Sequence, residues 1–156
     1  MNAIVSAALA RELATLTRVA SAAAGALGYG VDLHCVSDVR ADLAEVDPTT
    51  AQGVVEACIR RLTCPRGGNP DDPDYGLDLR AYCNRGVTAL DLRMLGGAIR
   101  SELRKDDRVL DADVSVTTEA QSRLRVTVTL DVVDPALEEF SFTFAVTDAA
   151  ALLETL

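Results

Sequence analysis

The chain has 156 residues, enough for one domain that buries a hydrophobic core without disulfides or a structural metal. Its 24 acidic and 15 basic residues give a net charge of -9, which repels nucleic acids and anionic lipid surfaces and argues against both as partners. Hydrophobic residues make up 49% of the chain but aromatic residues only 4%, so the core is expected to consist mainly of Ala, Val and Leu. Other proteins are therefore the expected partners.

The N-terminal stretch, residues 3–27, has the composition of an Ala-rich helix. Its apolar residues recur at steps of three and four, as in a heptad seam; they are Leu9, Leu13, Leu16, Ala20, Ala23 and Leu27. Such a short seam needs a partner helix from this domain or from another chain. Charged residues interrupt the stretch, so neither a signal peptide nor a membrane span fits, and we expect a cytosolic chain. The expected organisation is an amphipathic helix over residues 1–28 and an α+β domain over residues 29–156.

The next part of the chain predicts a short strand over residues 29–35 and a helix over residues 48–62. Asp47 is the expected N-cap of this helix, with Pro48 at its first position, and Pro65 ends it. Residues 65–76 are rich in proline and glycine and are expected to form an exposed loop. A short helix should follow within residues 76–86.

A longer helix is predicted over residues 88–105, where Thr88 and Asp91 have the spacing of a capping box. Gly96 and Gly97 lie in the middle of this helix, each at a cost of about 1 kcal/mol relative to alanine. We therefore expect another backbone to approach them closely, either a strand of this domain or a helix of a partner.

From Ala112 onward the apolar residues alternate with polar ones, which is typical of strands. Three such segments, residues 112–117, 123–132 and 139–146, follow one another with turns at residues 118–122 and 134–138, and all three phenylalanines fall on one face. The predicted fold is α+β, a three-stranded antiparallel meander packed against two or three helices, with an N-terminal helix. Residues 148–156 are predicted to form a last short helix.

Metal sites and cofactors are not indicated by the sequence. The four cysteines, Cys35, Cys58, Cys64 and Cys83, lack CxxC spacing and are expected to be half-buried, although a four-cysteine zinc site stays an alternative. Three aspartates in the 65–76 loop lack the glycine and glutamate of a calcium-binding loop. His34 is expected on a polar surface. No cofactor is therefore expected.

Four features follow one another along the chain: "RLTCPRG", "DPDYGLDL", an amphipathic helix ending in "DDRV", and an alternating strand pair. This order resembles the small baseplate wedge proteins of contractile phage tails and related injection systems, a family historically described as lysozyme-like. The resemblance covers residues 45–146. Tyr75, Gly76 and Leu79 match the family's "fG..l" element. Asp106, Asp107 and Arg108 stand where the family has Glu-Pro-Arg, with the arginine identical and the first acidic charge kept.

The resemblance implies a structural role in a virion baseplate or a cytoplasmic contractile assembly, where strand edges nucleate the sheath. It also implies that other wedge proteins and the sheath protein are the partners. Residues 123–133 are a credible template for an added strand, unless Arg123, Arg125 and Asp131 merely protect the edge. Asp106, Asp107 and Arg108 are expected to lock the joint between helix and sheet, and in the family this cluster also touches neighbouring wedge subunits. A solvated charged turn is the alternative.

Two other function classes remain open. A lysozyme-like glycoside hydrolase needs two carboxyl groups, one with a raised pKa in an apolar pocket, whereas Glu102 and Asp106 are expected on a polar helix face. A stand-alone adaptor would use the N-terminal seam to bind one helix. We expect no catalytic residues and an assembly role.

Overall fold

The computed structural model describes residues 32–33, 45–83, 85–120, 123–137 and 139–156. The predicted N-terminal helix, with Leu9, Leu13 and Leu16, lies outside these residues, as do His34 and Cys35. Of the predicted 29–35 strand, only β1, Asp32–Leu33, is described, and it pairs antiparallel with β2, Glu45–Val46.

The main sheet is antiparallel, with strand order β3-β4-β5-β6. The strands are β3, Val109–Ala120; β4, Arg123–Val132; β5, Phe140–Val146; and β6, Ala151–Thr155. The first three are the predicted meander, with β3 extending further in both directions than its apolar alternation indicates. The prediction of a C-terminal helix is wrong, because residues 151–155 pair with β5 as a fourth strand.

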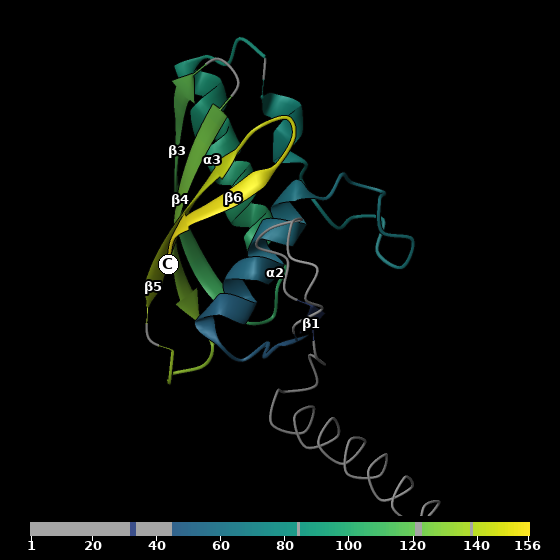
Figure 1. The fold of residues 1–156 in the computed structure, drawn as a ribbon, viewed down its shortest axis with the longest axis vertical. Coiled ribbons are helices and arrows are strands. Elements are labelled where there is room, and N and C mark those ends of the chain that lie inside the picture. Colours follow the sequence, from purple (N-terminus) through teal and green to yellow (C-terminus); the bar gives the residue numbers. More distant parts are fainter. Residues whose placement is uncertain (1–31, 34–44, 84, 121–122, 138) are drawn as a thin grey trace, which may run out of the picture.

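Helices α2 and α3 cover one face of this sheet (Figure 1). The helix α2, Ala51–Thr63, starts later than predicted: its N-cap is Thr50, whose hydroxyl accepts from the Gly53 N–H. Asp47 instead accepts from the backbone and hydroxyl of Thr49, so Pro48 precedes the helix. The helix α3, Ala89–Leu103, has the predicted capping box between Thr88 and Asp91. A short 3-10 helix, η1, covers Leu79–Tyr82.

The core lies between the two helices and the inner face of the sheet. As predicted, aliphatic residues dominate it, and the phenylalanines of β5 face inward; the rings of Phe142 and Phe144 stack with centroids 5.8 Å apart. Alternating residues of β4 belong to the same core and are fully buried; these are Leu124, Val126, Val128 and Leu130. None of the helices within the described ranges is long and apolar enough to cross a bilayer.

The two glycines of α3 differ. A Cβ at Gly96 would lie 3.5 Å from the carbonyl oxygen of Val114, so β3 is the backbone that approaches this position. A Cβ at Gly97 would meet no atom of the described residues within 4 Å. The expected close approach of a strand of this domain is therefore confirmed at Gly96, whereas Gly97 faces open space.

Candidate functional site

The last turn of α3 contains a buried carboxylate, Glu102, whose side chain is 2% exposed. Its Oε1 accepts from the Arg61 guanidinium at 3.2 Å and from the Gly76 N–H at 3.0 Å, and its Oε2 accepts from Arg66 at 3.1 Å. Lys105 Nζ lies 2.8 Å from Oε2. The Glu102 cluster, defined as Glu102, Arg61, Arg66, Lys105 and the Gly76 N–H, thus ties α2, α3 and the loop after α2 together.

Gly76, singled out by the "fG..l" match, has a conformational reason to be glycine. Its φ is +103°, and an added Cβ would lie 2.3 Å from the carbonyl oxygen of Cys64. Beside it, the Tyr75 ring lies 4.3 Å beneath the Arg61 guanidinium carbon, and Leu79 is fully buried in the core. This element therefore anchors the 65–76 loop, whose tip is exposed as expected.

Asp106, Asp107 and Arg108 form the joint between α3 and β3. The Arg108 guanidinium binds both Asp106 oxygens, Nε to Oδ1 at 2.9 Å and Nη2 to Oδ2 at 2.6 Å, and also donates to the Pro48 carbonyl at 3.2 Å. The side chains of Arg108 and Asp106 are only 15% and 12% exposed, and Asp107 is exposed. Arg108 thus fastens the start of β3 to the segment before α2, a bidentate geometry that lysine cannot reproduce.

Arg108 also lines a shallow, mostly apolar pocket between the start of α2 and the end of β4. Val54 and Val132 form its floor, and Val133, which is 46% exposed, and Leu137 form its rim. The joint is therefore next to apolar surface that another chain could cover.

Two carboxylates of this region, the buried Glu102 and the half-buried Asp106, are both held in the charged form. Burial by itself raises the pKa of Glu102, but the hydrogen bonds from Lys105, the Gly76 N–H and Arg61 outweigh it and leave the pKa below its ordinary value. Burial also opposes ionisation of Asp106, yet the side-chain and backbone bonds from Arg108 lower its pKa. The expectation that Glu102 lies on a polar face is wrong. Its environment is nevertheless opposite to that of a general acid, which needs a raised pKa.

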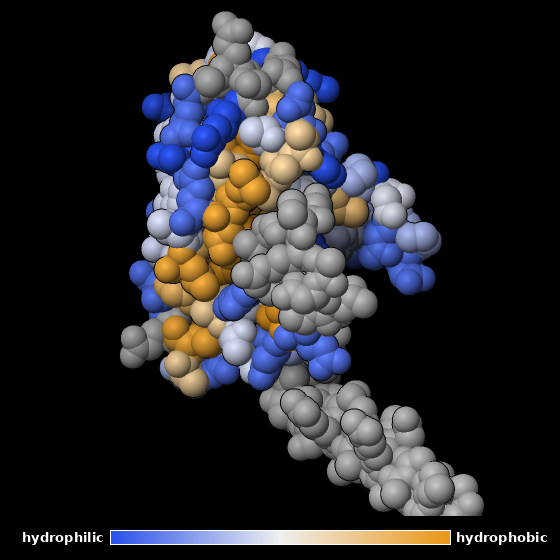
Figure 2. Space-filling view, viewed as in Figure 1, coloured by the Kyte–Doolittle hydropathy of each residue, from blue (hydrophilic) through white to orange (hydrophobic). Residues whose placement is uncertain are grey.

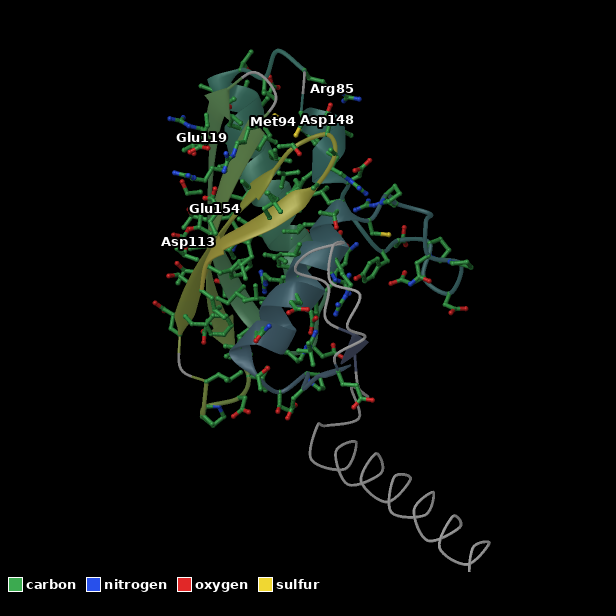
Figure 3. All side chains as sticks on the ribbon, in the orientation of Figure 1. Arg85, Met94, Asp113, Glu119, Asp148 and Glu154 are labelled. Atoms are coloured by element: carbon green, nitrogen blue, oxygen red, sulfur yellow. The ribbon has the colours of Figure 1, made fainter. Side chains whose placement is uncertain are left out.

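Arg123 and Arg125 lie on the outer face of β4, where they bind one acidic residue of the adjacent strand β3 and one of β6, which lies beyond β5. Arg123 pairs with Glu119 of β3 and Glu154 of β6, and Arg125 pairs with Glu119 at 2.8 Å and Glu154 at 3.1 Å. Figure 3 shows Glu119 and Glu154 on the same side of the sheet. The outer-face quartet, defined as Arg123, Arg125, Glu119 and Glu154, thus links β3, β4 and β6. Its bonds to β6 pass across β5, which lies between β4 and β6.

The expectation that residues 123–133 form an accessible strand edge is wrong. β4 pairs along its whole length with β3 and along most of it with β5, so its backbone is occupied on both sides. Because of the four-strand order, the outermost strands of the sheet are β3 and β6. Arg123, Arg125 and Asp131 therefore mark the outer face of the sheet rather than its edge.

The three cysteines within the described ranges are free thiols: Cys58 and Cys83 are buried, and Cys64 is half-buried. Burial raises the pKa of Cys58 to about 12, so it stays a neutral, unreactive thiol at physiological pH. No group of three or more potential metal-ligating His, Cys, Asp or Glu side chains occurs in the part of the chain that the structure describes.

Comparison with known proteins identifies a fold rather than a family. No family model matches the sequence, and no curated protein matches it. Among solved structures, the chain is similar to one from Geobacter sulfurreducens described as a "putative tail lysozyme", with a TM-score of 0.52 and 18% sequence identity over 66% of this chain and 91% of that chain. The two proteins therefore share a fold, and that fold occurs in a protein named a tail lysozyme.

Proposed function

We propose that this protein is a structural component of the baseplate of a contractile phage tail or a related contractile injection system, where it nucleates sheath assembly. The observation that carries the proposal is a four-stranded sheet that ends in a long outer strand, β3, beside an open groove. An outer strand presents unpaired N–H and C=O groups that a strand of another chain can bind. The fold shared with a tail protein and the match of residues 75–79 and 106–108 to the wedge family support the same role.

The proposed partners are other wedge proteins and the sheath protein. The joint at Arg108, with its apolar pocket and the exposed Asp107, is the proposed contact with a neighbouring wedge subunit. The outer strands of the sheet are the proposed contact with the sheath. The predicted seam of Leu9, Leu13 and Leu16 is proposed to bind a partner helix, and the site of action is the baseplate, assembled in the cytoplasm.

The test is to prepare tail particles with and without this chain and to image them by electron microscopy. Particles that contain the chain should carry sheath from the first ring onward, and particles that lack it should have baseplates and tubes without sheath. Adding back the purified chain should restore sheath. Full-length sheath in its absence would contradict the proposal.

We further propose that the protein is not an enzyme, although its structural neighbour is named a lysozyme. The support is that the buried Glu102 and the half-buried Asp106 have lowered pKa values and are bound by cations. Incubation of the purified chain with peptidoglycan should release no soluble sugar. If it did, and if Glu102→Gln abolished the release, the hydrolase alternative would replace this proposal.

A further inference from the structure

The free edge of β3 is long and regular. The strand has 12 residues, and irregularities in its pairing with β4 occur only near its two ends, between Val109 and Asp111 and between Thr118 and Ala120. The eight residues from Asp111 to Thr118 form a continuous stretch of about 27 Å, at about 3.4 Å per residue. On its other side no strand of the described residues pairs with it, so alternate N–H and C=O groups of this stretch point outward.

A groove of about 410 Å³ runs between this edge and α3. Its lining includes Val114, Ser115 and Val116 from β3 and Leu92 and the two glycines from α3. Ser115 belongs to the outer face of the sheet and its two valine neighbours to the inner face, so the groove opens along the strand edge itself. Because Gly97 lacks a side chain and has no atom within 4 Å of an added Cβ, the helix leaves space where side chains of a further strand would lie.

The lining of this groove combines apolar residues with polar ones, among them Arg93 of α3. Leu92, Val114 and Val116 are only partly buried although they pack against the core. Leu90 and Met94 of α3, which are 66% and 67% exposed, do not line the groove but are spaced with Gly97 at i, i+4 and i+7 along the helix. An added strand would bury the inward valines, which no element of the described chain covers fully.

The outer side of β3 is acidic. The strand has no basic residue, and its outward positions include Asp111, Asp113 and Glu119. Arg100 binds Asp111 at 2.9 and 2.5 Å, and Arg123 and Arg125 bind Glu119, whereas Asp113 is the exposed carboxylate between them (Figure 3). An incoming strand with basic residues on this side would therefore be favoured over an acidic one.

We infer that the free edge of β3 binds an extended segment of a different protein, with apolar side chains directed into the α3 groove and basic side chains opposite Asp113. This inference rests on the proposed function and specifies the edge and the chemistry of the strand that the protein accepts. A second copy of this chain fits less well, because antiparallel pairing of β3 with itself about Ser115 would place Asp111 of one copy opposite Glu119 of the other.

The other outer strand, β6, is a poorer acceptor. It has five residues, its pairing with β5 has a register shift at Thr143 and Phe144, and its Glu154 is bound by Arg123 and Arg125. It does expose Leu152, as does the chain directly after it at Leu156, and Figure 2 shows apolar surface in the region that β6 occupies in Figure 1. The experiment therefore has to distinguish the two edges.

The test uses the full chain and an eight-residue peptide in which valine alternates with lysine, with hydrogen-deuterium exchange as the readout. Saturating peptide at ten times its dissociation constant should slow exchange of the outward amides of residues 111–118 about tenfold. A peptide alternating valine with glutamate should have no effect. Gly97→Leu should fill the groove and abolish the slowing, and Ser101→Leu, which adds the same side chain one turn away outside the groove, should not.

A second variant addresses charge. Asp113→Lys should weaken binding of the lysine peptide at least tenfold, whereas Asp71→Lys, with the same change of net charge in the exposed loop, should leave it unchanged. No slowing at millimolar peptide, slowing at residues 151–155 instead, or slowing that persists in Gly97→Leu would overturn the inference. Formation of β3-linked dimers without peptide would overturn it in favour of a second copy.

The same variants separate this inference from the proposed function. If Gly97→Leu blocks peptide binding and particles with this variant still carry full sheath, the β3 site exists but does not nucleate sheath. If sheath grows from the wild-type chain and the peptide never binds β3, nucleation uses another surface and the inference fails alone.

Discussion

The two halves of α3 contrast with each other. At its C-terminal end, charged groups are buried and paired: Glu102 joins α2 and the 65–76 loop, and Arg108 joins the start of β3 to Pro48. In its N-terminal half, the helix exposes Leu90 and Met94 and leaves the edge of β3 uncovered.

This contrast shows how one helix can serve both stability and assembly. Buried charges are costly unless every one has a partner, so the C-terminal half gains little from a further chain. Partly covered valines and unpaired backbone groups gain from an added strand. Substitutions in the C-terminal half of α3 should therefore change mainly folding, and substitutions in its N-terminal half should change mainly binding.

Gly76→Ala should have the largest effect. Alanine is strained at φ +103°, and its Cβ would overlap the Cys64 carbonyl oxygen at 2.3 Å, so the backbone of the loop must shift. We expect a loss of about 4 kcal/mol in the free energy of unfolding, measured by urea denaturation. Gly86→Ala is the matched control, since its Cβ meets no atom within 4 Å, and should change stability by less than about 0.5 kcal/mol.

Glu102→Gln should be the next largest change. It leaves Arg61 buried without its carboxylate, while Arg66 and Lys105 reach solvent, and should cost about 3 kcal/mol at pH 7. Because the folded pKa of Glu102 lies below its unfolded value of about 4.3, its stabilisation is present above that pH and is lost as pH falls through the folded pKa. Urea midpoints of wild type and variant should therefore converge between about pH 5 and pH 2. A difference that stays constant over this range would show that the charge of Glu102 is not what stabilises the fold; Glu139→Gln, on an exposed carboxylate, is the control.

Arg108→Ala should combine a moderate loss of stability with loss of assembly. Removing the guanidinium that binds Asp106 and the Pro48 carbonyl should lower the free energy of unfolding by about 2 kcal/mol and leave the domain folded. We expect folded variant protein that does not support sheath growth, assessed by circular dichroism and by imaging of particles. Arg108→Lys keeps the charge and should recover only part of the stability. A full-length sheath built with Arg108→Ala would remove this residue from the interface.

Gly97→Ala should have the smallest effect and the opposite sign. The position is helical and its Cβ meets no neighbour, so alanine should stabilise the isolated protein by about 1 kcal/mol. The increase in melting temperature would be measured by scanning calorimetry. Gly96→Ala, whose Cβ would touch the Val114 carbonyl oxygen at 3.5 Å, should gain less. Destabilisation by Gly97→Ala would mean that the groove is closed in solution.

Much of the fold follows from patterns that act locally. Strict alternation predicts β3, β4 and β5, and the Thr88 and Asp91 spacing predicts the start of α3, because these signals depend on neighbours in the chain. The first four residues of the β6 segment, Ala151–Thr155, have good helix propensity. Only its pairing with β5 makes it a strand, and that tertiary contact leaves no local trace.

The candidate site is harder to predict from the sequence than the fold. The match of Gly76 and Arg108 to a family pattern indicated the positions, but their bonds to Glu102, Asp106 and Pro48 join residues up to 60 positions apart. A signal for Glu102 did exist: it follows Leu95 and Ile99 at i+7 and i+3, and so continues the buried stripe of α3. A carboxylate in such a stripe indicates a buried ion pair.

Anchoring of the 65–76 loop by the Glu102 cluster also has a consequence for proteolysis. Most of this loop is exposed and rich in glycine and proline, so a protease would be expected to cut it readily. Its base, however, is bonded to α3 through Gly76 and Glu102, and Glu102 also binds Arg61 of α2, so opening the loop at its base disrupts the ion pair that joins the two helices. Cleavage in this segment should therefore proceed at a rate that follows global unfolding rather than local fluctuation.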